Sequence, residues 1–114
     1  MSRSCFKFNY ISFEKTKKII ENELRKSGFS NKNENGENVW KCGNGILTAM
    51  KYIKIEFSGN QEVKIYGWIR AIAASEQNLD GIVAAIPKKQ VLKVIKKIGD
   101  CIVSVSYTHL SDFL

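Results

Sequence analysis

Two stretches near the middle of the chain alternate apolar and polar residues, at positions 46–57 and 61–72. A period of two is typical of strands that bury one face. The sequence Ser58-Gly59-Asn60 between them suits a tight turn, so the two stretches predict a β-hairpin. We expect one face of this hairpin to meet helices, and the residues on that face are Ile53, Ile55, Phe57, Val63, Ile65, Gly67 and Ile69.

The start of the chain predicts a strand followed by a helix. Residues 5–10 alternate apolar and polar side chains and indicate a short strand. Ser12 stands where a helix N-cap belongs, and an apolar stripe with the helical period follows it. Gly28 suits the position just after a helix end, so we expect a helix over residues 13–27.

The polar segment after this helix predicts a loop. Residues 30–38 hold four asparagines and no apolar residue, which is typical of turns and mobile connections. Residues 39–42 can add a short strand before the hairpin, and residues 73–86 then form a crossover that leads away from it.

A second helix is expected over residues 87–98. Pro87 suits the first position of a helix, and aliphatic residues follow it at helical spacing among five lysines. Gly99-Asp100 predicts the end of this helix, and residues 102–107 can form a last strand.

The order of these elements is β-α-β-β-β-α, with the last strand as an option. It predicts an α+β fold: an antiparallel sheet of four to five strands with two helices packed on one face. The length of 114 residues suits one domain, which we assign to residues 1–103. Residues 104–110, SVSYTHL, resemble a peptide that arises when sequencing-adaptor DNA is translated, so we treat residues 104–114 as a tail that need not be native.

The composition adds a basic balance, with a net charge of +7. Such a charge favours acidic partners such as nucleic acid, anionic lipid or an acidic protein surface. No apolar run approaches the roughly 20 residues of a membrane helix, and the first residues lack the apolar core of a signal peptide, so we expect a cytoplasmic protein. The three cysteines, Cys5, Cys42 and Cys101, are too widely spaced for a metal motif, and we expect them reduced and mostly buried.

One face of the predicted hairpin mixes aromatic and basic side chains. These residues form our candidate interaction face: Tyr52, Lys54, Lys64, Tyr66, Trp68 and Arg70. Such a face can stack on unpaired bases and neutralise phosphates, it can dock on another domain or a second copy, or it can simply be a solvated sheet face. The lysine-rich second helix also allows two interpretations. Its lysines can form a solvated face over a buried apolar stripe, or they can contact an anionic membrane.

The crossover holds a second candidate, formed by Glu76, Asn78, Asp80 and Gly81. Two nearby carboxylates can perform acid–base chemistry when their pKa values are split. An Asp-Gly pair is also an ordinary turn, and Asn and Asp side chains bind nearby backbone N–H groups. We therefore expect these residues to shape an exposed loop rather than to catalyse a reaction.

Residues 53–98 resemble a small bacterial domain of unknown function. In that family a strand that ends in Trp leads into an E-x-x-L-D-G-x-x-A-x-x-P-K crossover and then a helix. The matching residues here are Trp68, Glu76, Leu79, Asp80, Gly81, Ala84, Pro87 and Lys88. The resemblance implies no activity and supplies no catalytic residue.

Taken together, these features predict a non-catalytic binding module without cofactor or metal, which docks on another protein domain or on a second copy of itself. The alternative is a nucleic-acid-binding domain that uses the basic and aromatic sheet face. A membrane surface is a third candidate partner, and only the lysine-rich helix supports it.

Overall fold

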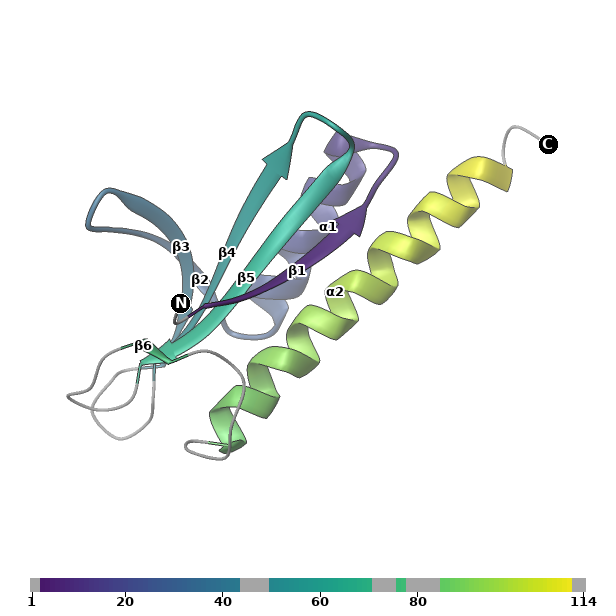
Figure 1. Cartoon of the computed structure of the whole chain (residues 1–114). Helices are drawn as coiled ribbons and strands as arrows, with labels where there is room; N and C mark the ends of the chain where they lie inside the picture. The colour runs from purple at the N-terminus through teal and green to yellow at the C-terminus, as the bar shows by residue number, and fades with distance from the viewer. Residues whose placement is uncertain (1–2, 44–49, 71–75, 78–84, 112–114) are drawn as a thin grey trace.

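The strands form one antiparallel sheet, with both helices on the same face (Figure 1). The computed structural model describes residues 3–43, 50–70, 76–77 and 85–111. The sheet order is β1-β5-β4-β3-β2, and β6 pairs with β5 past the start of β1. The predicted α+β fold is thereby confirmed. The elements are β1 (Ser4–Asn9), α1 (Phe13–Lys26), β2 (Ser30–Glu34), β3 (Glu37–Cys42), β4 (Met50–Ser58), β5 (Glu62–Arg70), β6 (Glu76–Gln77) and α2 (Ala85–Ser111).

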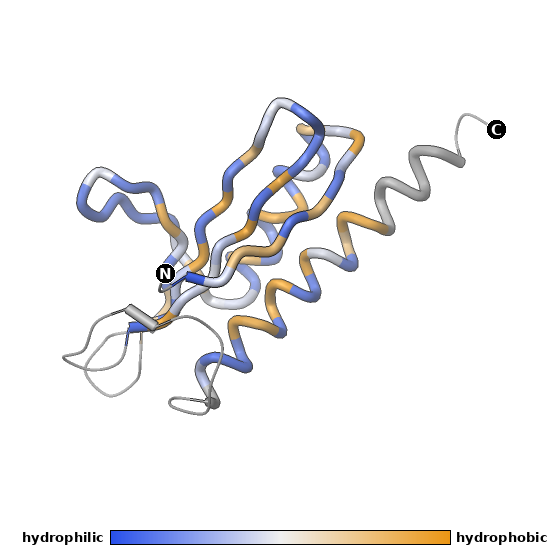
Figure 2. Tube along the Cα trace, in the orientation of Figure 1, coloured by the Kyte–Doolittle hydropathy of each residue, from blue (hydrophilic) through white to orange (hydrophobic). Residues whose placement is uncertain are grey.

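The β4–β5 hairpin has the two faces that its sequence predicts. Ile55 pairs with Ile65, and Phe57 with Val63, so the apolar residues of both strands share one face. They join the apolar stripes of α1 and α2 in the main core, and Figure 2 shows the alternation along the strands. A register slip of one residue would turn the whole apolar set away from the helices. We call the two sides of the sheet the helix-covered face and the far face.

Helix α1 begins and ends where its sequence predicts. The Ser12 hydroxyl accepts a hydrogen bond from the backbone N–H of Lys15 at 3.3 Å, which satisfies a donor that the first turn leaves unpaired. Ile20 and Leu24 are fully buried against the sheet. Gly28 follows the helix with φ of +90°, a conformation that glycine adopts without strain.

Helix α2 is longer than predicted, and two expectations about it are wrong. Gly99 does not end the helix, and residues 102–107 are helical rather than a strand. A Cβ atom at Gly99 would lie only 2.4 Å from Cε1 of Phe8, so glycine allows β1 and α2 to approach closely. The buried stripe continues past Gly99 to Ile102, and this tertiary contact outweighs the low helix propensity of glycine.

The segment over residues 30–38 is a hairpin, so the predicted loop is wrong. Strands β2 and β3 pair with each other, and Asn35-Gly36 forms the turn between them. Both turn residues have positive φ, +54° and +78°, which is typical of a type I′ hairpin turn. The polar strand β2 forms because β3 offers a partner for its backbone, not because it buries side chains of its own.

The lysines of α2 divide into two groups. Lys89, Lys93, Lys96 and Lys97 are exposed, as expected for a solvated face, whereas Lys88 is buried. Among the described helices, none combines the length and apolarity that a bilayer crossing needs.

Candidate functional site

The candidate interaction face lies on the far face of the sheet. Tyr52 pairs with Trp68 and Lys54 with Tyr66 across β4 and β5, so each pair projects to the same side. Lys64 and Arg70 lie on β5 at even spacing from Tyr66 and project there as well. The register therefore brings all six predicted residues onto one surface.

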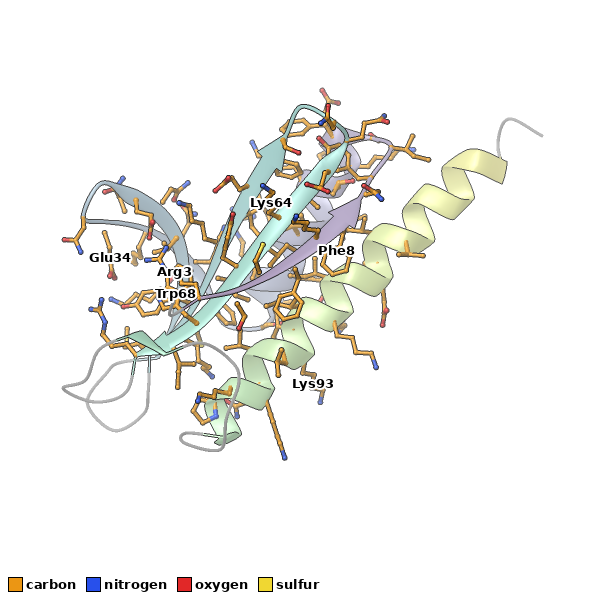
Figure 3. The ribbon with its side chains drawn as sticks, viewed as in Figure 1. Arg3, Phe8, Glu34, Lys64, Trp68 and Lys93 are labelled. Carbon is orange, nitrogen blue, oxygen red and sulfur yellow. The ribbon has the colours of Figure 1, made fainter. Side chains whose placement is uncertain are left out.

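Two of the three rings on this face are buried. Tyr52 and Trp68 stack with ring centroids 5.2 Å apart and planes inclined by only 3°, and their exposed fractions are 3% and 2%. The Arg3 guanidinium covers Trp68 at 3.7 Å from the ring centroid (Figure 3). Neither ring is open to stack on a base, and of the three only Tyr66 keeps a partly exposed ring. The sequence pattern assigned these residues to one face but could not indicate that Arg3 closes over it.

The β2–β3 hairpin adds two carboxylates that the sequence interpretation missed. The first is Glu34, which lies 2.5 Å from Nζ of Lys41 and accepts a hydrogen bond from the Tyr52 hydroxyl at 3.3 Å. The Lys41 ammonium lowers the pKa of Glu34, and Glu34 in turn raises the pKa of Lys41. Burial raises the pKa of Tyr52, so this phenol remains protonated at neutral pH.

The second carboxylate, Glu37, bridges Arg3, which directly precedes β1, and Lys54 on β4. It accepts hydrogen bonds from Arg3 at 3.0 Å and from Lys54 at 3.2 Å. The hydrogen bond from Arg3 is the main cause that lowers the pKa of Glu37. Lys54 is thus already engaged within the chain and is less available to a phosphate than its sequence position suggests.

A small cleft of about 160 Å³ remains between these groups. Its lining includes Glu34, Glu37, Arg3 and Arg70 around the Tyr52–Trp68 stack. Both carboxylates have lowered pKa values and a cationic partner, so neither can hold a proton to donate near neutral pH. The arrangement is that of an internal ion-pair network that locks β1, the β2–β3 hairpin and β4 together.

The crossover candidate is described only at its start. Glu76 lies in β6, where its backbone pairs with that of Arg70. Asn78, Asp80 and Gly81 lie outside the described residues, so their expected role in the loop stays a prediction. Across the part of the chain that is described, no three His, Cys, Asp or Glu side chains gather as metal ligands.

A different surface, between β1 and α2, offers an open groove of about 390 Å³ that the sequence interpretation did not identify. Leu92 and Val103 on α2 border it, with exposed fractions of 36% and 62%. Their spacing of eleven residues is three helical turns, so they lie on one side of α2. This signal was hidden by the expectation that the helix stops at residue 98. We call this surface the β1–α2 groove, and its lining is Phe6, Phe8, Leu92, Ile95, Lys96, Gly99, Asp100 and Val103.

Comparison with known protein families, with curated proteins and with solved structures gives no match. The resemblance of residues 53–98 to a bacterial domain of unknown function therefore stays a prediction.

Proposed function

We propose that this chain is a non-catalytic binding module that docks on another protein. The observation that carries this proposal is an edge strand beside an apolar groove with lysines around it. An exposed strand edge is a template for a strand of another chain, and neighbouring pockets then select its side chains.

The sheet edge beside this groove is that of β1. In the described sheet β1 is an end strand, and no other strand pairs along its edge away from β5. The backbone N–H of Tyr10 donates to the carbonyl of Gln61 at 2.9 Å, which marks the Tyr10–Gln61 pair as hydrogen-bonded. Hydrogen-bonded pairs alternate along an antiparallel ladder, so the backbone groups of Cys5, Lys7 and Asn9 point to the free edge.

The groove gives this edge a side-chain preference. Phe6 and Phe8 project from β1 toward α2 and line the β1–α2 groove, and Figure 3 shows Phe8 between the two elements. Partner residues opposite Phe6 and Phe8 would project to the same side and would contact Leu92 and Val103. Apolar side chains suit those two positions.

The charges on β1 and β5 indicate which residue the partner segment carries between its two apolar positions. On the far face, Glu56 pairs with Lys64, and Lys64 pairs with Lys7 at the edge. The cross-strand row of Glu56, Lys64 and Lys7 thus ends with two adjacent lysines, whose positive charges repel each other. An acidic residue opposite Lys7 would relieve that repulsion. We therefore propose an extended partner segment with the order apolar, acidic, apolar.

A second copy of this chain fits the edge less well. Pairing of two β1 strands would bring together two chains that each carry a net charge of +7. Each copy would also bring the exposed Lys96 that borders its β1–α2 groove. The charge balance favours an acidic partner segment over self-association.

The experiment uses a short fluorescein-labelled peptide of alternating valine and glutamate and measures its binding by fluorescence anisotropy. We expect saturable binding, with no binding of a peptide that has lysine in place of glutamate. In the bound peptide the glutamates would lie opposite Lys7, whose backbone groups point to the free edge. The N–H groups of the glutamates would therefore face β1. N-methylation of the glutamates should weaken binding about tenfold or more, because each lost hydrogen bond contributes roughly 1 kcal/mol. N-methylation of the valines, whose N–H groups point away, should leave the affinity unchanged.

Matched protein variants locate the site. Lys7→Glu should weaken binding of the acidic peptide about threefold or more, since it replaces an attractive cross-strand pair with a repulsive one. Lys32→Glu is the control, because Lys32 is an exposed lysine on β2, the strand at the opposite edge. Absence of binding by the folded protein, or equal effects of both variants, would overturn the proposal.

The far face keeps nucleic-acid binding as the second candidate function. Tyr66 is partly exposed and lies between Lys54 and Lys64. Its ring could stack on one base, and the two lysines could contact the neighbouring phosphates. The same face also carries the negative charges of Glu34, Glu37 and Glu56. These charges weigh against the binding of a polyanion. Salt-sensitive binding of single-stranded oligonucleotides that is lost in Tyr66→Ala would support this candidate, and no salt-dependent binding would remove it.

A further inference from the structure

A second cavity lies between α1 and strands β2, β3 and β4, away from the β1–α2 groove. Its volume is about 360 Å³, which is within the range of small-molecule sites. We call it the α1 pocket. Its lining is Phe13, Lys17, Ile20, Glu21, Arg25, Asn31, Asn38, Trp40, Ile55 and Phe57.

The apolar side of the α1 pocket is aromatic. Trp40 and Phe57 contribute from the helix-covered face of the sheet, and Ile20 contributes from α1. Phe13 packs edge to face on Phe57 at 4.7 Å between ring centroids, yet it keeps an exposed fraction of 47%. A large ring at the first position of a helix, half-covered beside other rings, leaves apolar surface that a ligand could bury.

The polar rim of the α1 pocket is predominantly cationic. Lys17, Glu21 and Arg25 follow one another at four-residue spacing on α1, so they lie along one side of the helix. The Arg25 guanidinium is 5.4 Å from the Trp40 ring centroid and 4.0 Å from the Glu21 carboxylate. The contact with Glu21 is long and exposed, and it leaves one net positive charge on this side of the rim.

We propose that the α1 pocket binds a small amphipathic anion, which is an aliphatic or aromatic body with one carboxylate or sulfonate group. The body would lie against the partly exposed rings of Phe13 and Phe57, with the buried Trp40 and Ile20 in the same lining. The anionic group would lie at Arg25 and Lys17, with amide donors from Asn31 and Asn38 on the β2–β3 hairpin. This site is separate from the docking edge of β1 and does not depend on the proposed function.

The test uses ω-bromodecanoate, because bromine quenches tryptophan fluorescence only at close range. The chain has two tryptophans, and only Trp40 lines the α1 pocket, whereas Trp68 lies on the far face. In Trp68→Phe, which leaves Trp40 as reporter, we expect saturable quenching. In Trp40→Phe, which leaves Trp68, we expect no saturable quenching.

The anionic group is tested by charge-matched comparisons. The neutral ω-bromodecanol should bind at least about tenfold more weakly than ω-bromodecanoate, because it lacks the charge that Arg25 and Lys17 attract. Arg25→Gln should weaken ω-bromodecanoate binding about fivefold or more. Lys18→Gln is the control, because it removes the same charge from an exposed α1 residue outside the lining.

Far-UV circular dichroism and a melting curve establish that each variant is folded before binding is measured. Equal affinity for the acid and the alcohol would overturn the assignment of an anion site. Equal quenching of Trp40 and Trp68, or no quenching of either, would overturn the location of the site in the α1 pocket.

Discussion

The contact between Gly99 and Phe8 gives a prediction in which the usual effect of a substitution reverses. In an exposed helix interior, replacement of glycine by alanine stabilises a protein by about 1 kcal/mol. At Gly99 the added Cβ would lie 2.4 Å from Cε1 and 2.7 Å from Cζ of the Phe8 ring. Carbon atoms approach no closer than about 3.5 Å without repulsion, so Phe8 or α2 has to move.

The magnitude follows from two opposing contributions. Overpacking of a well-packed contact costs roughly 1–3 kcal/mol, and the gain in helix propensity offsets about 1 kcal/mol of that. We expect Gly99→Ala to lower the free energy of unfolding by about 1 kcal/mol, which is a fall in melting temperature of roughly 4 °C for a domain of this size.

A second substitution isolates the cause. Phe8→Leu removes the two ring atoms that lie closest to the added Cβ, Cε1 and Cζ, but keeps an apolar side chain; the next ring atom of Phe8, Cδ1, lies 3.2 Å from that Cβ in the wild type. In this background Gly99→Ala should stabilise the protein by up to about 1 kcal/mol, so the double-mutant cycle should give a coupling of about 2 kcal/mol.

The assay is urea unfolding, monitored by circular dichroism at 222 nm, a wavelength that reports helix. The four proteins of the cycle are compared with the same slope of unfolding free energy against urea concentration. A Gly99→Ala protein that is more stable than wild type would mean that the added Cβ fits beside Phe8 without overpacking, contrary to this prediction. A coupling near zero would also contradict it, because the contact with Phe8 would then not be the reason for glycine at this position.

Three further predictions concern the turns and the far face. Gln61 has φ of +57° at the end of the β4–β5 turn, so Gln61→Gly should raise the melting temperature by removing strain of about 1 kcal/mol, and a decrease would argue against that strain. Glu34 has a lowered pKa because of Lys41, so its stabilising contribution is present above the ordinary pKa of about 4.5 and is lost as the pH falls further. Urea unfolding between about pH 5 and pH 3 should therefore be less pH-dependent in Glu34→Gln than in wild type, and identical profiles would contradict the ion pair. Trp68→Ala should lower the free energy of unfolding by about 3–5 kcal/mol in the same assay, because it empties a buried position against Tyr52, and a loss below about 1 kcal/mol would mean that the stack is not formed in solution.

The candidate surfaces illustrate how far the sequence interpretation reaches. Strict alternation assigned Tyr52, Tyr66 and Trp68 to one face of the β4–β5 hairpin, and the register confirms that assignment. It could not show that two of these rings are buried. Their burial comes from Arg3 and from the β2–β3 hairpin, which are distant in sequence and reach the rings only through the order of strands in the sheet.

The missed hairpin has a local and a nonlocal cause. The pair Asn35-Gly36 is a strong type I′ turn signal, but its neighbours lack apolar residues and therefore predict a loop. Strand β2 buries little, and its pairing with β3 at the sheet edge is what fixes it. A hydrophobic pattern cannot predict a strand whose stability comes from its partner's backbone.

Features that depend on near neighbours along the chain follow from local sequence, without knowledge of the fold. These are the cap of α1 at Ser12, the two faces of the β4–β5 hairpin and the α+β class, because capping and side-chain periodicity are local properties. The length of α2 depends instead on packing between distant elements, because Gly99 continues the helix where Phe8 lies against its backbone. Tertiary packing also decides which surfaces are open, since exposure depends on which distant elements cover a residue, and a glycine that predicts a helix end in isolation becomes a packing position when a strand crosses it.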